Sequence, residues 1–206
     1  MRDLVSAFVT LFVTIDPPGL APLFLAVTAG MTRSQRAQIA ARASLTAFAV
    51  LLLFAVAGTA VLQILGITIH AFRIAGGLLL FHIAFEMIFE KRHERHERSA
   101  ERAVTADHIR NIAIFPLAIP LIAGPGAISA TVLLSGSFQG FAAQATLVGI
   151  IAVCLLLTYL VFILAERIDR LLGQTGRSIL TRLLGVILAA LAVQFVADGI
   201  RELLAV

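Results

Sequence analysis

Long apolar stretches alternate with short polar segments along almost the whole chain. Six of the stretches are about 20 residues or longer, which is enough for an α-helix to cross the roughly 30 Å hydrocarbon core of a bilayer. They cover residues 4–29, 40–62, 67–89, 108–134, 143–165 and 180–202. The pattern predicts an all-α integral membrane protein with six transmembrane helices.

The composition supports the same class of protein. Hydrophobic residues make up 60% of the 206 residues, charged residues 14%, and the mean hydropathy is +1.00, whereas a soluble domain carries about a quarter charged residues. The single cysteine, Cys154, excludes a disulfide framework and a CxxC metal or redox site. The net charge of +4 does not indicate nucleic-acid binding, because the basic residues gather in loops without interleaved aromatic residues.

Positive charge is unevenly distributed among the polar segments. Of the 16 lysines and arginines, all but Arg2, Arg73 and Arg201 lie in or beside the segments that follow the first, third and fifth apolar stretches. Loops rich in Lys and Arg stay on the cytoplasmic side of a membrane. We therefore expect the inner membrane of a prokaryote, with both termini on the periplasmic side.

The longest polar segment, residues 91–107, reads KRHERHERSAERAVTAD. Its acidic and basic residues alternate at helical spacing, which is typical of a solvated cytoplasmic helix or linker with weak ion pairs. His93 and His96 lack a second pair of ligands nearby, so we expect no metal site. The segment separates residues 1–90 from residues 108–206, each with three apolar stretches.

The two parts share a pattern of proline, glycine and arginine. The matching positions, 107 or 109 residues apart, are Pro18-Gly19 with Pro125-Gly126, and Arg73-x-x-Gly76 with Arg182-x-x-Gly185. Because three crossings are an odd number, the second part enters the membrane upside down relative to the first. The sequence therefore predicts two inverted three-helix repeats, which are typical of secondary transporters.

Proline and glycine interrupt the first and fourth stretches. These clusters predict an unwound helix near mid-membrane, where proline removes donors and glycine relaxes the chain. They comprise Pro17, Pro18, Gly19 and Pro22 in the first stretch, and Pro116, Pro120, Gly124, Pro125 and Gly126 in the fourth. Freed amides at Gly19-Leu20 and Gly126-Ala127 attract an anionic group, and freed carbonyls hold a cation or an ammonium. A zwitterion such as an amino acid satisfies both.

Asp16 is the deepest charged residue of the first stretch. A carboxylate in the bilayer core is expensive and usually functional, so Asp16 is a candidate for pairing with a substrate amine, binding a coupling cation or carrying a proton. The alternative is an N-cap of the second half-helix, since Asp before Pro is a good helix start. The hydroxyls of Thr14, Ser129 and Thr131 are either ligands or bonded back to their own helices.

Other intramembrane polar residues are candidates for structural roles. His82 and Glu86 share a helix face, which leaves a proton relay as one alternative. Glu86 is expected at the interface in a structural role, and the role of His82 stays open. Arg73 is expected to reach the outer headgroups. The residues assigned a structural role are Pro22, Arg73, Gly76, Gly77, Pro116, Pro120, Pro125, Arg182 and Gly185, of which Gly76, Gly77 and Gly185 allow close helix packing.

Several motifs resemble those of the MarC family of six-span prokaryotic membrane proteins. They are Asp16-Pro17…Pro22, Arg73-Ile74-Ala75-Gly76-Gly77, Asn111-Ile112-Ala113…Pro116-Leu117-Ala118-Ile119-Pro120…Ala123-Gly124-Pro125-Gly126-Ala127-Ile128, and Val193-Gln194-Phe195…Asp198-Gly199-Ile200. The resemblance covers essentially the whole chain. It implies a small neutral amino acid transporter that moves glycine or alanine with a cation gradient, and discontinuous first and fourth helices that meet at a central site.

We therefore expect a secondary transporter for a small neutral amino acid, coupled to H⁺ or Na⁺, with no cofactor. The residues expected at the substrate are Asp16, Pro17, Gly19, Leu20, Gly124, Gly126, Ala127 and Ser129, with Asp16 also the candidate for cation coupling. An exporter or channel for another small solute is the alternative. A membrane-embedded enzyme is disfavoured because no acid–base or nucleophile–base pair accompanies Asp16. Small residues permit a homo-oligomer without requiring one.

Overall fold

The computed structural model describes residues 2–89 and 113–205, and every regular element in these ranges is helical. The helices are α1 (Arg2–Ile15), α2 (Pro17–Val27), α3 (Arg33–Ile64), α4 (Ile69–Ile88), the π-helix η1 (Ala113–Ile122), α7 (Pro125–Ser137), α8 (Phe141–Ile163) and α9 (Ala165–Leu204). The charged segment 91–107, with His93 and His96, lies outside the described residues.

Five of the helical segments are long and apolar enough to cross a membrane. They are Asp3–Val27, Arg33–Ile64, Ile69–Ile88, Phe141–Ile163 and Thr175–Leu204, and they correspond to the first, second, third, fifth and sixth predicted crossings. The predicted all-α membrane fold is thus confirmed. In the remaining apolar stretch, η1 and α7 have only 10 and 13 residues, so neither spans a bilayer alone.

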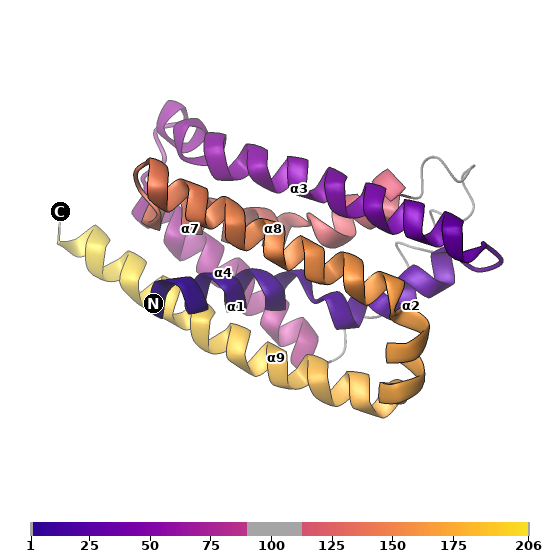
Figure 1. Ribbon diagram of the computed structural model, residues 1–206. Coiled ribbons are helices and arrows are strands. Elements are labelled where there is room, and N and C mark those ends of the chain that lie inside the picture. Colours follow the sequence, from indigo (N-terminus) through magenta and orange to yellow (C-terminus); the bar gives the residue numbers. More distant parts are fainter. Residues whose placement is uncertain (1, 90–112, 206) are drawn as a thin grey trace.

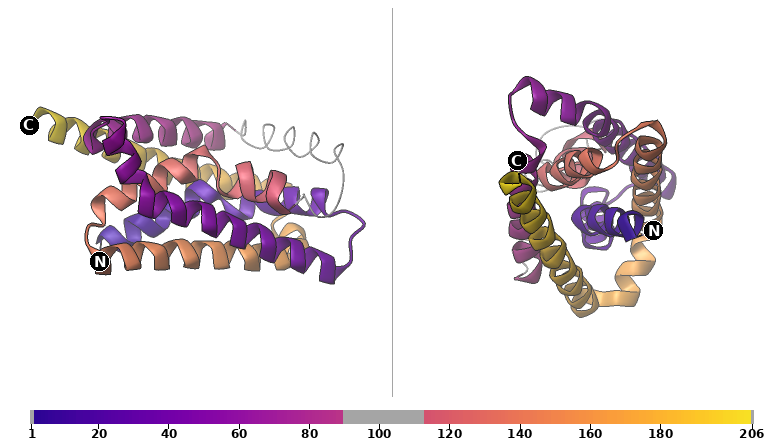
Figure 2. Two further views of the ribbon diagram at one scale, coloured as in Figure 1. Left: turned by 90° about the horizontal axis from the view of Figure 1, so that it is seen from above. Right: turned by 90° about the vertical axis from the view of Figure 1, so that its left-hand side faces the viewer.

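The helices lie roughly parallel in one bundle, with α1 and α2 inside it. In Figure 1, α3 and α8 run together along one side and α4 and α9 along the other. The end-on view in Figure 2 places α1 between α8 and α9. In the most apolar window of Asp3–Val27, 61% of the residues are buried, whereas the share is 22–39% in the other four candidate spans. The interrupted first stretch therefore forms the centre of the protein.

Local sequence signals set several helix boundaries. Thr32 begins α3 with a capping box: its hydroxyl accepts from the Gln35 amide, and the Gln35 side chain accepts from the Thr32 amide. Gly173 has φ +59° and bends α9 into a short limb and a long one, and the bend is visible at the lower right of Figure 1. Arg177 pairs with Asp169 across it.

Helices α4 and α9 run antiparallel and make the most extensive helix–helix contact among the described residues. Glycines allow the approach: a methyl group built on Gly77 would lie 3.0 Å from the Ala192 carbonyl oxygen, and one on Gly185 would lie 3.1 Å from the Ala84 carbonyl oxygen. Gly76 instead faces Leu133 of α7. Small residues let helix backbones approach closely where apolar burial supplies no driving force.

We predict that Gly77→Ala lowers the free energy of unfolding by about 1–3 kcal/mol, the usual effect of overpacking a tight contact. The added methyl group would also meet Val196 Cγ2 at 2.8 Å. SDS titration of the purified protein in mixed micelles measures the change. Gly149→Ala is the matched control, because its methyl group meets nothing within 4 Å. Equal stability of the two variants would contradict the prediction.

Candidate functional site

Helix α1 ends and α2 begins at a single residue, Asp16. Its backbone adopts the left-handed conformation (φ 56°, ψ 60°), which is uncommon for a residue other than glycine. The Asp16 amide still donates to the Phe12 carbonyl at 2.9 Å, and its carbonyl accepts from the Leu20 amide at 3.1 Å. Helical hydrogen bonding therefore stops and restarts within one residue, and the axis changes direction there.

The Asp16 side chain caps α2. Its Oδ1 accepts from the Gly19 amide at 3.2 Å. Pro17 and Pro18 occupy the first two helical positions, where a backbone N–H would have no acceptor within the helix, so proline loses no hydrogen bond there. The residue is only 3% exposed. Pro22 lies inside α2, which continues past it. Asp16 therefore combines the cap expected from its sequence position with deep burial.

The second interruption has a different backbone. The chain leaves η1 through a wide turn, in which the Ala123 amide donates to the Ala118 carbonyl at 2.8 Å, and Gly124 is extended before α7 starts at Pro125. A methyl group on Gly124 would lie 2.3 Å from the Pro120 carbonyl oxygen, so only glycine fits. Gly124 also supplies no side-chain cap. The Gly124 carbonyl accepts from the Ile128 amide at 3.0 Å, but the amides of Gly126 and Ala127 receive no side-chain acceptor from the residue that precedes the helix.

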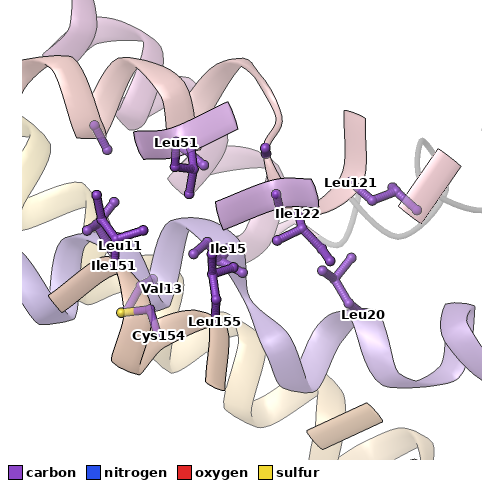
Figure 3. Close-up of a cluster of buried hydrophobic side chains, with 14 of the residues drawn as sticks. Leu11, Val13, Ile15, Leu20, Leu51, Leu121, Ile122, Ile151, Cys154 and Leu155 are labelled. Atoms are coloured by element: carbon purple, nitrogen blue, oxygen red, sulfur yellow. The ribbon is translucent and has the colours of Figure 1, made fainter. Parts of the chain in front are cut away.

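The two interruptions are in contact. A methyl group on Gly126, in the first turn of α7, would lie 3.2 Å from Thr14 Cγ2 of α1 and 2.2 Å from Ile83 Cδ1 of α4. Figure 3 shows Ile15 and Leu20, on either side of Asp16, in one apolar cluster with Ile122 of η1. Segments more than 100 residues apart thus meet in the protein interior.

The environment of this contact is almost entirely apolar. Leu20, Ile122, Ala123 and Ala127 are each at most 2% exposed. An ionised carboxylate in such surroundings is costly unless it is paired, and buried intramembrane carboxyl groups such as Asp16 are therefore candidates for a functional role.

Two of the three hydroxyls near the interruptions bond within their helices. Thr14 Oγ1 donates to the Thr10 carbonyl at 2.5 Å, and Thr131 Oγ1 donates to the Ala127 carbonyl at 2.7 Å. Back-bonding of this kind satisfies a buried hydroxyl. Ser129 lies one turn into α7 and is half-buried.

Two ion-pair clusters at the ends of the bundle were not predicted from the sequence. Arg73 pairs with Glu202 of α9, whose Oε2 also lies 2.7 Å from His70 Nδ1, so Arg73 has a protein partner in addition to any headgroup. Arg36 pairs with Glu166 at the start of α9. The partners are 129 and 130 residues apart, and no local pattern marks them.

Two further polar pairs each lie within one helix. His82 Nε2 lies 3.6 Å from Glu86 Oε1, with Glu86 largely buried and His82 exposed. Gln194 Nε2 donates to Asp198 Oδ1 at 2.9 Å. Arg182 is exposed on α9.

We predict that Gly19→Ala disrupts the cap at Asp16. The new methyl group would lie 2.2 Å from Asp16 Oδ2 and 2.7 Å from its Cγ, so the carboxylate has to move away from the Gly19 amide. Loss of an N-cap lowers the free energy of unfolding by about 0.5–2 kcal/mol, which denaturation followed by circular dichroism measures. Gly176→Ala is the control, because its nearest neighbour is at an ordinary 3.4 Å. A loss no larger than in the control would refute the displacement.

Comparison with known proteins places this arrangement in a family. The chain is similar over residues 1–204 to the family described as MarC family integral membrane protein. It is 38% identical to a UPF0056 membrane protein of Archaeoglobus fulgidus (96% of this chain, 92% of the relative), 36% to YvbG of Bacillus subtilis (96% and 94%) and 35% to YhcE of Escherichia coli (94% and 90%). No solved structure matches the chain. This protein therefore belongs to the MarC family of integral membrane proteins.

Proposed function

We propose that this protein is a secondary transporter of a small neutral amino acid such as glycine or alanine, coupled to H⁺ or Na⁺. One observation carries the proposal: a deeply buried carboxylate, Asp16, marks a helix interruption that packs against a second interruption. Interrupted helices that meet inside a membrane bundle are a recurrent design of transporter binding sites.

The chemistry of the two interruptions suits a zwitterion. The Asp16 carboxylate and the carbonyls that end α1 favour an ammonium or a coupling cation. The first-turn amides of α7, at Gly126 and Ala127, favour a carboxylate through the helix-end dipole. Close packing around Gly126 favours a small side chain. The choice of glycine or alanine rests on the family resemblance.

A hydrogen bond repeated in both halves supports the inverted-repeat interpretation. Arg36 Nε donates to the Thr28 carbonyl at 3.3 Å, between α3 and the end of α2. Gln144 Nε2 donates to the Ser135 carbonyl at 3.2 Å, between α8 and the end of α7. The two donors are 108 residues apart and the two acceptors 107, close to the 107-residue offset of the Pro-Gly pairs. On this interpretation η1 and α7 together make the fourth crossing, as α1 and α2 make the first.

The ends of the bundle support alternating access and an orientation. The α2–α3 hairpin and the α8–α9 junction enclose a cleft of about 450 Å³, and the α7–α8 hairpin and the α3–α4 junction enclose one of about 400 Å³. Inverted repeats make the two clefts equivalent, one on each face. The first is lined by arginines and the second by neutral amides, which supports a cytoplasmic position for the first. The start of α1 and the end of α9 lie at the opposite end of the bundle (Figure 1), which supports periplasmic termini.

Other functions predict different behaviour. A channel or a passive exporter would pass solute without saturation and without a dependence on an ion gradient. We propose neither an enzymatic activity nor a cofactor for this protein.

We expect purified protein in proteoliposomes to accumulate radiolabelled glycine or alanine when an inward H⁺ or Na⁺ gradient is imposed, because coupling to a bound cation supplies the driving force. Empty liposomes and liposomes with the gradient collapsed by ionophores are the controls. Absence of gradient-dependent uptake of both amino acids, together with absence of binding by the purified protein, would exclude the amino acid proposal.

We predict that Asp16→Asn lowers coupled uptake at least about tenfold, since removal of the charge discards a charge-assisted interaction of about 1.5–3 kcal/mol. Asn is as good an N-cap as Asp, so stability should stay close to that of the wild type. Asp198→Asn, at a residue near the end of α9, is the matched control. Wild-type uptake with unchanged ion dependence in Asp16→Asn would reduce Asp16 to a helix cap.

A further inference from the structure

The cleft between the α2–α3 hairpin and the α8–α9 junction has two chemically distinct walls. Arg33, Ser34 and Arg36, from the first turn of α3, form the polar wall together with Arg167 of α9. The apolar wall comes from the end of α8 and the first residue after it, Ile163 and Leu164. The boundary between the apolar and the polar wall therefore lies where the candidate membrane span Phe141–Ile163 ends.

The polar wall carries uncompensated positive charge. Arg36 is engaged by Glu166 and by the Thr28 carbonyl oxygen, 3.3 Å from its Nε. Arg33 and Arg167 are exposed, and neither has an ion-pair partner within residues 2–89 and 113–205. Two guanidinium groups therefore remain available at the mouth of the cleft. A guanidinium is the side chain best suited to a phosphate, because its planar fork donates two parallel hydrogen bonds.

The equivalent cleft at the opposite end of the bundle lacks this charge. It is lined by Gln63, Gln139 and Gln144, with no arginine or lysine. The hairpin architecture alone therefore does not require arginines in such a cleft. Basic residues gather at the end that holds the arginine-lined cleft, as the positive-inside rule expects of a cytoplasmic face. Two of them line that cleft without an ion-pair partner among the described residues, which suits it to a ligand of negative charge.

The apolar wall extends the site toward lipid. Ile163 is 43% and Leu164 40% exposed, while Phe162 behind them is buried. A soluble anion would gain nothing from these exposed aliphatic side chains. A lipid would bury them under an acyl chain while its phosphate reached the arginines, and basic pockets between transmembrane helices on the cytoplasmic side are a known mode of anionic lipid binding.

We infer that this cleft is a binding site for an anionic phospholipid, with the lipid phosphate held between Arg33 and Arg167 and an acyl chain along Ile163 and Leu164. The bound lipid connects the start of α3 to the start of α9, and so adds to the connection that the Arg36–Glu166 pair makes between the same two helices. The site does not depend on the proposed transport of amino acids.

Native mass spectrometry of the purified protein, titrated with phosphatidylglycerol or with phosphatidylcholine of the same acyl chains, tests the inference. We expect wild-type protein to retain phosphatidylglycerol about thirtyfold more tightly, because each of the two arginines near a membrane surface contributes about 1 kcal/mol toward an anionic lipid. Arg33→Gln combined with Arg167→Gln should bring this ratio close to one. Arg33→Lys combined with Arg167→Lys should retain part of it, since charge remains without the fork.

Arg42→Gln is the control, because Arg42 is an equally exposed arginine of α3 outside the cleft. It should keep the wild-type ratio. Unchanged preference for phosphatidylglycerol in the double glutamine variant, or an equal loss in Arg42→Gln, would overturn the inference. Displacement of phosphatidylglycerol by millimolar inorganic phosphate would also overturn it, because the cleft would then bind a soluble anion.

Discussion

A backbone that leaves the helix in an apolar interior must have its polar groups satisfied by the protein itself. In this protein the constraint is met at Asp16, where the left-handed turn keeps both flanking backbone hydrogen bonds and adds a third, from the Gly19 amide to the carboxylate. The interruption is therefore reduced to one residue. The consequence is a carboxyl group placed at the centre of the bundle, between helices that are otherwise lined by leucine, isoleucine and alanine. The surrounding helices pack around this point.

The second interruption meets the same constraint by other means. A π-helical segment and an extended glycine deliver the chain to Pro125 without a side-chain cap, and the first turn of α7 then packs on Thr14. One interruption thus presents a carboxylate and the other presents amides. This asymmetry within a repeated architecture is what suits the proposed site to a ligand with both charges, and it explains why neither interruption alone would define a substrate.

Charge at the two ends of the bundle is arranged around the hairpins. At one end Arg36 joins α3 to Glu166 and to the end of α2, and at the other Arg73 and His70 join α4 to Glu202. These ion pairs are only partly buried, and ion pairs near the surface contribute little to stability. In the proposed transporter their importance would lie in which helices they connect, because a protein that opens to each side in turn must release such connections alternately. The proposed lipid in the arginine-lined cleft adds to the connection at one end only.

The sequence by itself determined the features that depend on neighbouring residues. The apolar stretches predicted the helices, the proline and glycine clusters predicted where α1 and η1 would end, and Asp16 before Pro17 predicted a cap. These follow from backbone geometry and local hydrogen bonding. The extent of each interruption did not follow, because the rest of the protein decides how much unwound chain can be buried. The ion pairs of Arg36 and Arg73, the contact of Thr14 with Gly126 and the pairing of α4 with α9 join residues about 100 or more apart. Only the packing of the whole bundle selects such partners, since their energies depend on which helix faces come together in space.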